Sequence, residues 1–177
     1  MASLQDLIVK ITKANIWSEP LSLKRGEHLS EAGKVDQKVY WIKEGCLQFN
    51  LLADGEEQSI RFAYPGNMVS VLDSYISGTA SKYSLQALRK SEVQFCTKQV
   101  FEAYLKSENL QEVWNQSLYQ LILEMMEREQ DLLLNSPADR LNRVLKRSPR
   151  LFQEVPHKYI ASYLRMSPET LSRLLNS

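Results

Sequence analysis

The chain has 177 residues, of which 44% are hydrophobic and 24% charged, and it carries a net charge of +1 at neutral pH. This composition is typical of a globular protein of one or two domains, and it excludes a fibre and a disordered charged tail. No apolar run approaches the roughly 18 residues of a membrane helix. Residues 1–10 lack the apolar region of a signal peptide. We therefore expect a cytoplasmic protein with no membrane partner.

Cysteine and histidine are too sparse and too scattered for a metal centre. Cys46 and Cys96 stand alone in strand-like contexts, and His28 and His157 are isolated in the sequence. Neither a CxxC pair nor a ligand cluster with zinc spacing occurs. We expect no metal and no cofactor.

The first half of the chain predicts a β domain. All six glycines lie there, spaced like turns between short β-branched and aromatic runs. Asp54-Gly55 predicts a hairpin, because glycine readily takes the positive φ of a tight turn. The strand-like runs are residues 39–42, 47–51, 59–64, 83–88 and 93–97. Many short strands at regular spacing favour an antiparallel barrel or sandwich.

The apolar period changes to a helical one after residue 99. Residues 100–105 predict a short amphipathic helix, and residues 109–135, without glycine or proline, predict a long one. Apolar residues alternate four- and three-residue steps along the long helix, interrupted at Arg128, with Ile122, Met126 and Leu133 beside them. We expect a dimer seam here; the alternative is a core helix of a monomer. The predicted seam consists of Trp114, Leu118, Leu121, Met125 and Leu132.

Three Ser-Pro pairs punctuate the C-terminal region at residues 136–137, 148–149 and 167–168. Each places a capping hydroxyl before a proline suited to a first helical turn. We predict helices at about 137–146, 156–164 and 168–175. From Ala138 onward the sequence has eight basic and three acidic residues, a net charge of +5, and the rest of the chain carries −4. This asymmetry favours an anionic partner for the C-terminal end, against the alternative of a solvated helical surface.

Residues 156–177 resemble the bacterial helix-turn-helix pattern. A short helix and a second helix flank a tight break, and Ala161 permits their close crossing. Arg165 stands where the pattern usually has glycine, so we expect an arginine with positive φ and some strain. The apolar positions are Ile160, Ala161, Leu164, Met166, Leu171, Leu174 and Leu175.

The whole chain resembles the Crp/Fnr family of transcription regulators. The resemblance rests on residues 24–27 (Lys-Arg-Gly-Glu), 40–45 (Tyr-Trp-Ile-Lys-Glu-Gly), 64–67 (Tyr-Pro-Gly-Asn) and the C-terminal motif. It implies an α+β fold made of three parts. These are an N-terminal antiparallel β jelly roll of the cyclic-nucleotide-binding type (1–108), a long dimerisation helix (109–135) and a helix-turn-helix DNA-binding domain (136–177).

The resemblance also implies the residues that contact double-stranded DNA. Glu169, Ser172 and Arg173 match the family's Glu-x-x-Ser-Arg arrangement for reading base edges, for which arginine and glutamate are chemically suited. Phosphate contacts are expected from Ser167, Thr170, Lys158 and Arg165. Because the sequence ends at Ser177 without a β-wing, a weaker phosphate grip than in longer relatives is expected.

The expected sensor departs from members that bind cyclic nucleotides. Ser70-Val71 stands where Gly-Glu would hold a ribose, and Ser81-Lys82-Tyr83 stands where an arginine motif would neutralise the cyclic phosphate. Cyclic AMP is therefore not expected, and the effector pocket, with an unknown small molecule as its ligand, has no assigned residues. RNA polymerase is a further partner that the resemblance implies.

Two other functions remain open at this point. In one of them, the chain is a ligand- or partner-binding module of the cyclic-nucleotide-binding type, and its C-terminal helices pack without binding DNA. An enzyme ranks third, because no nucleophile–base set, carboxylate pair or phosphate loop stands out in the sequence. The two histidines are isolated and leave little material for acid–base chemistry. We expect no catalytic residues.

Overall fold

The computed structural model describes residues 4–176. Its eight strands form two four-stranded antiparallel sheets, with the strand orders β1-β8-β3-β6 and β2-β7-β4-β5. The strands are β1 (Leu21–Leu23), β2 (His28–Ser30), β3 (Lys38–Glu44), β4 (Leu47–Ala53), β5 (Glu56–Ala63), β6 (Met68–Ser70), β7 (Tyr83–Ala87) and β8 (Ser91–Thr97). The expected α+β fold with a β jelly roll is confirmed.

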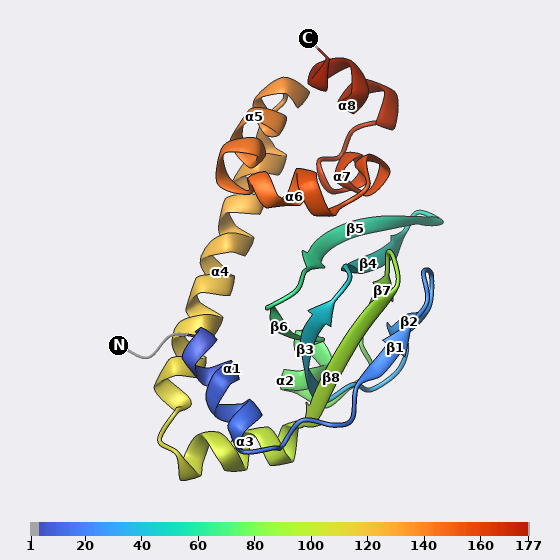
Figure 1. Cartoon of the computed structure of the whole chain (residues 1–177). Helices are drawn as coiled ribbons and strands as arrows, with labels where there is room; N and C mark the ends of the chain where they lie inside the picture. Colours follow the sequence, from blue (N-terminus) through green and yellow to red (C-terminus); the bar gives the residue numbers. More distant parts are fainter. Residues whose placement is uncertain (1–3, 177) are drawn as a thin grey trace.

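The helices flank this barrel and extend beyond it. The long helix α4 runs beside the barrel, from the end where α1 and α3 lie to the C-terminal helices at the opposite end (Figure 1). The helices are α1 (Leu4–Lys13), α2 (Leu72–Ser77), α3 (Lys98–Ser107), α4 (Gln111–Leu133), α5 (Pro137–Arg147), α6 (Pro149–Glu154), α7 (His157–Tyr163) and α8 (Pro168–Leu175). The short and the long helix expected after residue 99 are therefore α3 and α4.

The hairpin predicted at Asp54-Gly55 joins β4 to β5. Asp54 has φ 54° and Gly55 φ 80°, and positive φ at both central residues is the signature of a type I′ turn, whose twist matches that of the paired strands. The pairing Ala53↔Glu56 closes directly on the turn. The turn thus sets the register of the first part of β5, an edge strand of its sheet, up to an irregularity between Phe49 and Asn50.

Three apolar clusters hold the elements together. One fills the barrel, with Tyr40 and Ile42 of β3 facing Leu47 of β4 and Leu85 of β7. A second joins the barrel to α1, α3 and the start of α4. The third combines Phe62, Cys46 and Leu88 of the barrel with residues of α5 to α8. The C-terminal helices therefore pack against their own barrel through a shared core.

Candidate nucleic-acid interface

The last two helices form a compact helix-turn-helix. Ile160, Ala161, Leu164 and Leu171 are almost completely buried, and Ala161 has no exposed surface. Because alanine has only a methyl group, it allows α7 and α8 to approach closely at their crossing. Met166, Leu174 and Leu175 are partly buried against the same cluster. The apolar positions expected from the sequence all face this cluster.

The turn between α7 and α8 is left-handed at Arg165. Its φ is 54°, as expected for the position where glycine is usual, and an L-residue is strained in this conformation by about 1 kcal/mol. The Met166 amide donates to the Ala161 carbonyl at 3.0 Å. Arg165 therefore ends the path of α7 in a tight turn, and α8 begins at Pro168.

The start of α8 is capped as predicted. The Ser167 side chain accepts a hydrogen bond from the Thr170 amide at 3.2 Å, and Pro168 follows it in the first turn. The Ser136 side chain caps α5 in the same way, through the Asp139 amide. Ser148 precedes α6 but makes no side-chain cap. Two of the three Ser-Pro pairs therefore act as expected N-caps.

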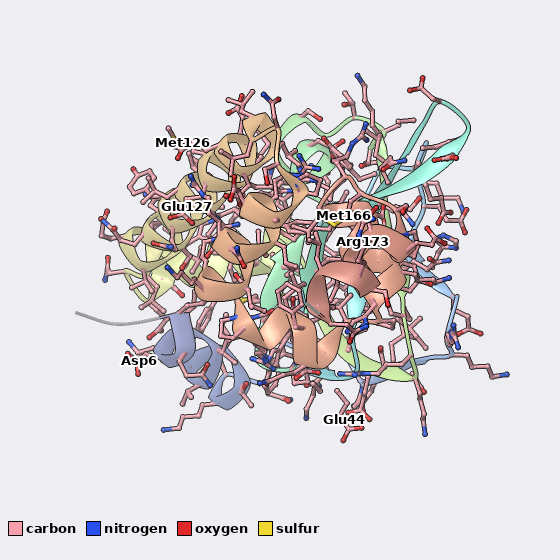
Figure 2. The ribbon with its side chains drawn as sticks, turned by 90° about the horizontal axis from the view of Figure 1, so that it is seen from above. Asp6, Glu44, Met126, Glu127, Met166 and Arg173 are labelled. Carbon is pink, nitrogen blue, oxygen red and sulfur yellow. The ribbon has the colours of Figure 1, made fainter. Side chains whose placement is uncertain are left out.

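One face of α8 is polar and turned to solvent. Glu169, Ser172 and Arg173 are exposed at positions i, i+3 and i+4, which share one side of a helix. Figure 2, which looks down on this end of the molecule, labels Arg173 on α8 and Met166 in the turn that precedes it. Hydrogen bonds from its own backbone amide and then from Ser167 lower the pKa of the Glu169 carboxyl. That carboxylate therefore stays an acceptor near neutral pH.

The basic residues of the C-terminal region divide into two groups. Four arginines are engaged within the chain. Arg143 and Arg147 pair with Asp131, Arg150 with Glu154, and Arg140 bonds backbone carbonyls. The exposed members without an ion pair to any other residue of the segment 4–176 are Lys146, Lys158, Arg165 and Arg173. The positive charge that is open to a partner is therefore smaller than the sequence count, and three of its four side chains lie on α7, on α8 or in the turn between them, while Lys146 lies on α5.

The predicted seam residues of α4 differ in exposure. Trp114 packs inside the chain, with its ring 5.0 Å from that of Phe101. Leu118, Leu121 and Leu132 are half-buried, and Met125 is 56% exposed. The neighbouring stripe is more open, with Met126 51% and Leu133 77% exposed, and Figure 2 shows Met126 at the outer edge of the molecule. The exposed apolar surface of α4 consists of Tyr119, Ile122, Leu123, Met125, Met126 and Leu133.

The turn at Ser81-Lys82, which corresponds to the arginine motif of a cyclic-nucleotide phosphate cassette, is closed by a carboxylate of the chain itself. Asp73 of α2 accepts hydrogen bonds from the Ser81 hydroxyl at 2.8 Å and from the Lys82 amide at 3.0 Å. The Ser74 amide donates to the same side chain at 2.9 Å. The Ser81 hydroxyl and the Lys82 amide are thus already bonded to the Asp73 carboxylate.

Among residues 4–176, no cluster of metal-ligating side chains occurs.

Sequence reasoning missed the residues that join the C-terminal helices to the rest of the chain. Arg128, noted only as an interruption of the seam, donates from Nη2 to the Ser59 carbonyl at 3.3 Å and lies over the Tyr163 ring at 4.8 Å. Burial lowers the pKa of this guanidinium. The position of Arg128 within the apolar repeat was the available signal, because a cation within a helix seam needs a polar partner.

In the described part of the chain no helix is long and apolar enough to span a bilayer.

Comparison with known proteins agrees with this architecture. A family model described as the cyclic nucleotide-binding domain matches residues 20–108, half of the chain. No curated protein sequence matches. FixK2 from Bradyrhizobium japonicum is similar in structure, with 19% identity, a TM-score of 0.76, and 91% of this chain and 83% of that chain covered.

Two further solved structures are similar over most of their length. The c-di-GMP responsive global regulator CLP from Xanthomonas campestris has 14% identity and a TM-score of 0.72, with 95% of this chain and 88% of that chain covered. TTHA1359, a CRP/FNR-family transcriptional regulator from Thermus thermophilus, has 18% identity and a TM-score of 0.66, with 89% and 84% covered. The chain therefore belongs to the cyclic nucleotide-binding domain family and has the fold of the Crp/Fnr transcription regulators.

Proposed function

We propose that this protein is a sequence-specific DNA-binding transcription regulator that acts as a homodimer. The observation that carries the proposal is the polar face of α8. Glu169, Ser172 and Arg173 are exposed on one side of a helix whose opposite side is buried at Leu171. An α-helix fits the major groove, where arginine can bond guanine O6 and N7 together and glutamate can accept from cytosine N4. α8 is then the recognition helix.

Phosphate contacts surround this reading face. Lys158 and Arg165 are exposed and have no ion-pair partner in the described chain, so their charges are open to the DNA backbone. Ser167 and Thr170 lie at the N-terminus of α8, where their hydroxyls and the positive end of the helix dipole favour a phosphate oxygen. In this proposal, phosphate contacts set the position of α8 and the base contacts supply sequence preference.

The exposed apolar surface of α4 is the proposed dimer contact, because six large apolar side chains turned to solvent on one helix favour a partner surface. A symmetric pair of α4 helices presents two copies of α8 to successive turns of a nearly palindromic site. The proposed division is a sensor at 1–108, a dimer helix at 109–135 and a DNA-binding domain at 136–177. The sensor responds to an effector other than cyclic AMP by shifting α4.

The test is selection of binding sites from random duplexes at near-physiological salt. We expect the wild-type protein to enrich a two-fold symmetric motif and Arg173→Ala to lose preference at one base pair of each half-site, a cost of about 1–3 kcal/mol. Arg150→Ala is the matched control, because this exposed arginine is already paired with Glu154. If the wild-type protein enriches no motif, the regulator proposal fails and a partner-binding barrel takes its place.

A further inference from the structure

Arg140 of α5 is a buried cation without a carboxylate partner among the described residues. Its side chain is 9% exposed, and its hydrogen bonds all go to backbone carbonyls. Nε donates to the Leu164 carbonyl at 2.9 Å, Nη1 to the Leu134 carbonyl at 2.6 Å, and Nη2 to the Arg165 carbonyl at 3.3 Å. A buried charge is tolerated only where such partners surround it.

Two of these carbonyls belong to the C-terminal ends of helices. Leu134 is the C-cap of α4, and Leu164 is the C-cap of α7. The last carbonyls of a helix lack partners within the helix and form the negative end of its dipole. One guanidinium therefore neutralises and ties together two helix ends that approach each other from residues 30 positions apart in the sequence.

The bond to the Arg165 carbonyl extends this link to the recognition helix. Arg165 is the left-handed residue of the turn, and α8 begins three residues later at Pro168. Asp131 near the end of α4 is 2% exposed and pairs with Arg143 and Arg147 of α5. The end of α4, the whole of α5 and the turn before α8 are thus held in one arrangement.

We infer that Arg140 is the positioning residue that fixes the direction of α8 relative to α4. In the homodimer proposed above, on which this inference rests, that direction determines how far apart and at what rotation two half-sites must lie. Arg140 touches no DNA and acts through the carbonyls of Leu134, Leu164 and Arg165. Its role is to set the half-site spacing that the dimer accepts.

The experiment measures affinity for duplexes in which the two half-sites are separated by the preferred spacer or by one base pair more or less. Each added base pair rotates a half-site by roughly 35° and moves it by about 3.4 Å. We expect wild-type affinity to fall at least about tenfold on either change, and Arg140→Gln to lose less than about threefold, because loosely tied readers accept several spacings. Affinity for a duplex with a single half-site is expected to stay unchanged.

The controls separate positioning from folding. Arg150→Gln makes the same chemical change at an arginine that bonds the Pro65 carbonyl of the barrel, and it is expected to keep the wild-type spacing preference. Arg140→Lys retains the charge but has a single donor group for three carbonyls, so it is expected to relax the spacing as well. Circular dichroism reports whether each variant is folded.

The outcomes are distinct. Retention of wild-type spacing discrimination by both Arg140 variants overturns the positioning role, and so does loss of the fold in both, or a loss of single-half-site affinity equal to the loss on the full site. Absence of any preferred site for the wild-type protein refutes the proposed function, and this inference with it. Relaxed spacing in the Arg140 variants alone supports the inference.

Discussion

The Ser59 amide of β5 donates a hydrogen bond to the Ser162 hydroxyl of α7 at 3.0 Å. The Ser59 carbonyl accepts one from Arg128 of α4. Because β5 is the edge strand of its sheet, these groups would otherwise lack a strand partner. The edge of the barrel is thus completed by the first helix of the helix-turn-helix and by the long helix, and this polar contact adds to the shared apolar core that joins the barrel to α5–α8.

Replacing Ser162 by alanine leaves the Ser59 amide, in a residue that is 3% exposed, without its acceptor. An unsatisfied buried donor costs about 1–3 kcal/mol, so we expect the free energy of unfolding to fall by that amount in chemical denaturation. Ser172→Ala removes an exposed hydroxyl from α8 and is expected to change it by less than about 0.5 kcal/mol. Equal stability of the two variants would show that the contact contributes nothing.

Met126→Glu tests the dimer. The methionine is 51% exposed in the single chain, so the change is tolerated by the monomer, whereas in a paired α4 it buries an unpartnered charge. We expect sedimentation velocity to report a dimer for the wild-type protein and a monomer for the variant. Gln120→Glu adds the same charge at another exposed position of α4 and should leave the dimer intact. A dimeric Met126→Glu protein would place the interface elsewhere.

Arg165 combines a strained backbone with an exposed charge, and two substitutions separate them. Both Arg165→Gly and Arg165→Ala remove one cation from each subunit of the proposed homodimer, so each should reduce the slope of log affinity against log salt by about 2. Only glycine relieves the positive φ, so the glycine variant should be more stable than the alanine variant by roughly 1 kcal/mol in denaturant titrations. An alanine variant as stable as the glycine variant would mean that the turn relaxes without strain.

The two cysteines give a pH-dependent prediction. Burial raises the pKa of Cys46 and of Cys96 to about 12. Both thiols should resist a disulfide reagent in the native protein at pH 8 and react after denaturation. In the unfolded chain these thiols ionise near pH 9, at lower pH than in the fold, so stability is full below about pH 8.5 and falls as pH rises, by up to about 1.4 kcal/mol per thiol per pH unit. Rapid reaction of the native thiols would contradict this burial.

Much of the fold could be predicted from local pattern. Five of the eight described strands, the hairpin at Asp54, the long helix and the helix-turn-helix all follow periods or turn residues that fall within one short window. The strands β1, β2 and β6 were not predicted, because three residues are too few to display alternation. The helix α6 was also missed, although Ser148-Pro149 marks its start.

Only part of the candidate site could be predicted from the sequence, for a related physical reason. Glu169 and Arg173 belong to a local motif, and their exposure follows from the buried face opposite them. Arg140, in contrast, acts on carbonyls that any residue type could supply, so no sequence pattern marks its partners. Net charge could not separate Arg143, which is paired to Asp131, from Lys158, which makes no ion pair in the described chain.

The closure of the cassette turn by Asp73 has a consequence for ligands. Asp73 lies only eight residues from Ser81, so any phosphate that approaches the Ser81 hydroxyl and the Lys82 amide competes with an anion on a short tether. A tether of that length corresponds to an effective concentration of about millimolar or more. The Asp73 carboxylate is thus a permanently tethered competitor. An anion from solution binds at this turn only when it displaces Asp73 from the Ser81 hydroxyl and the Lys82 amide.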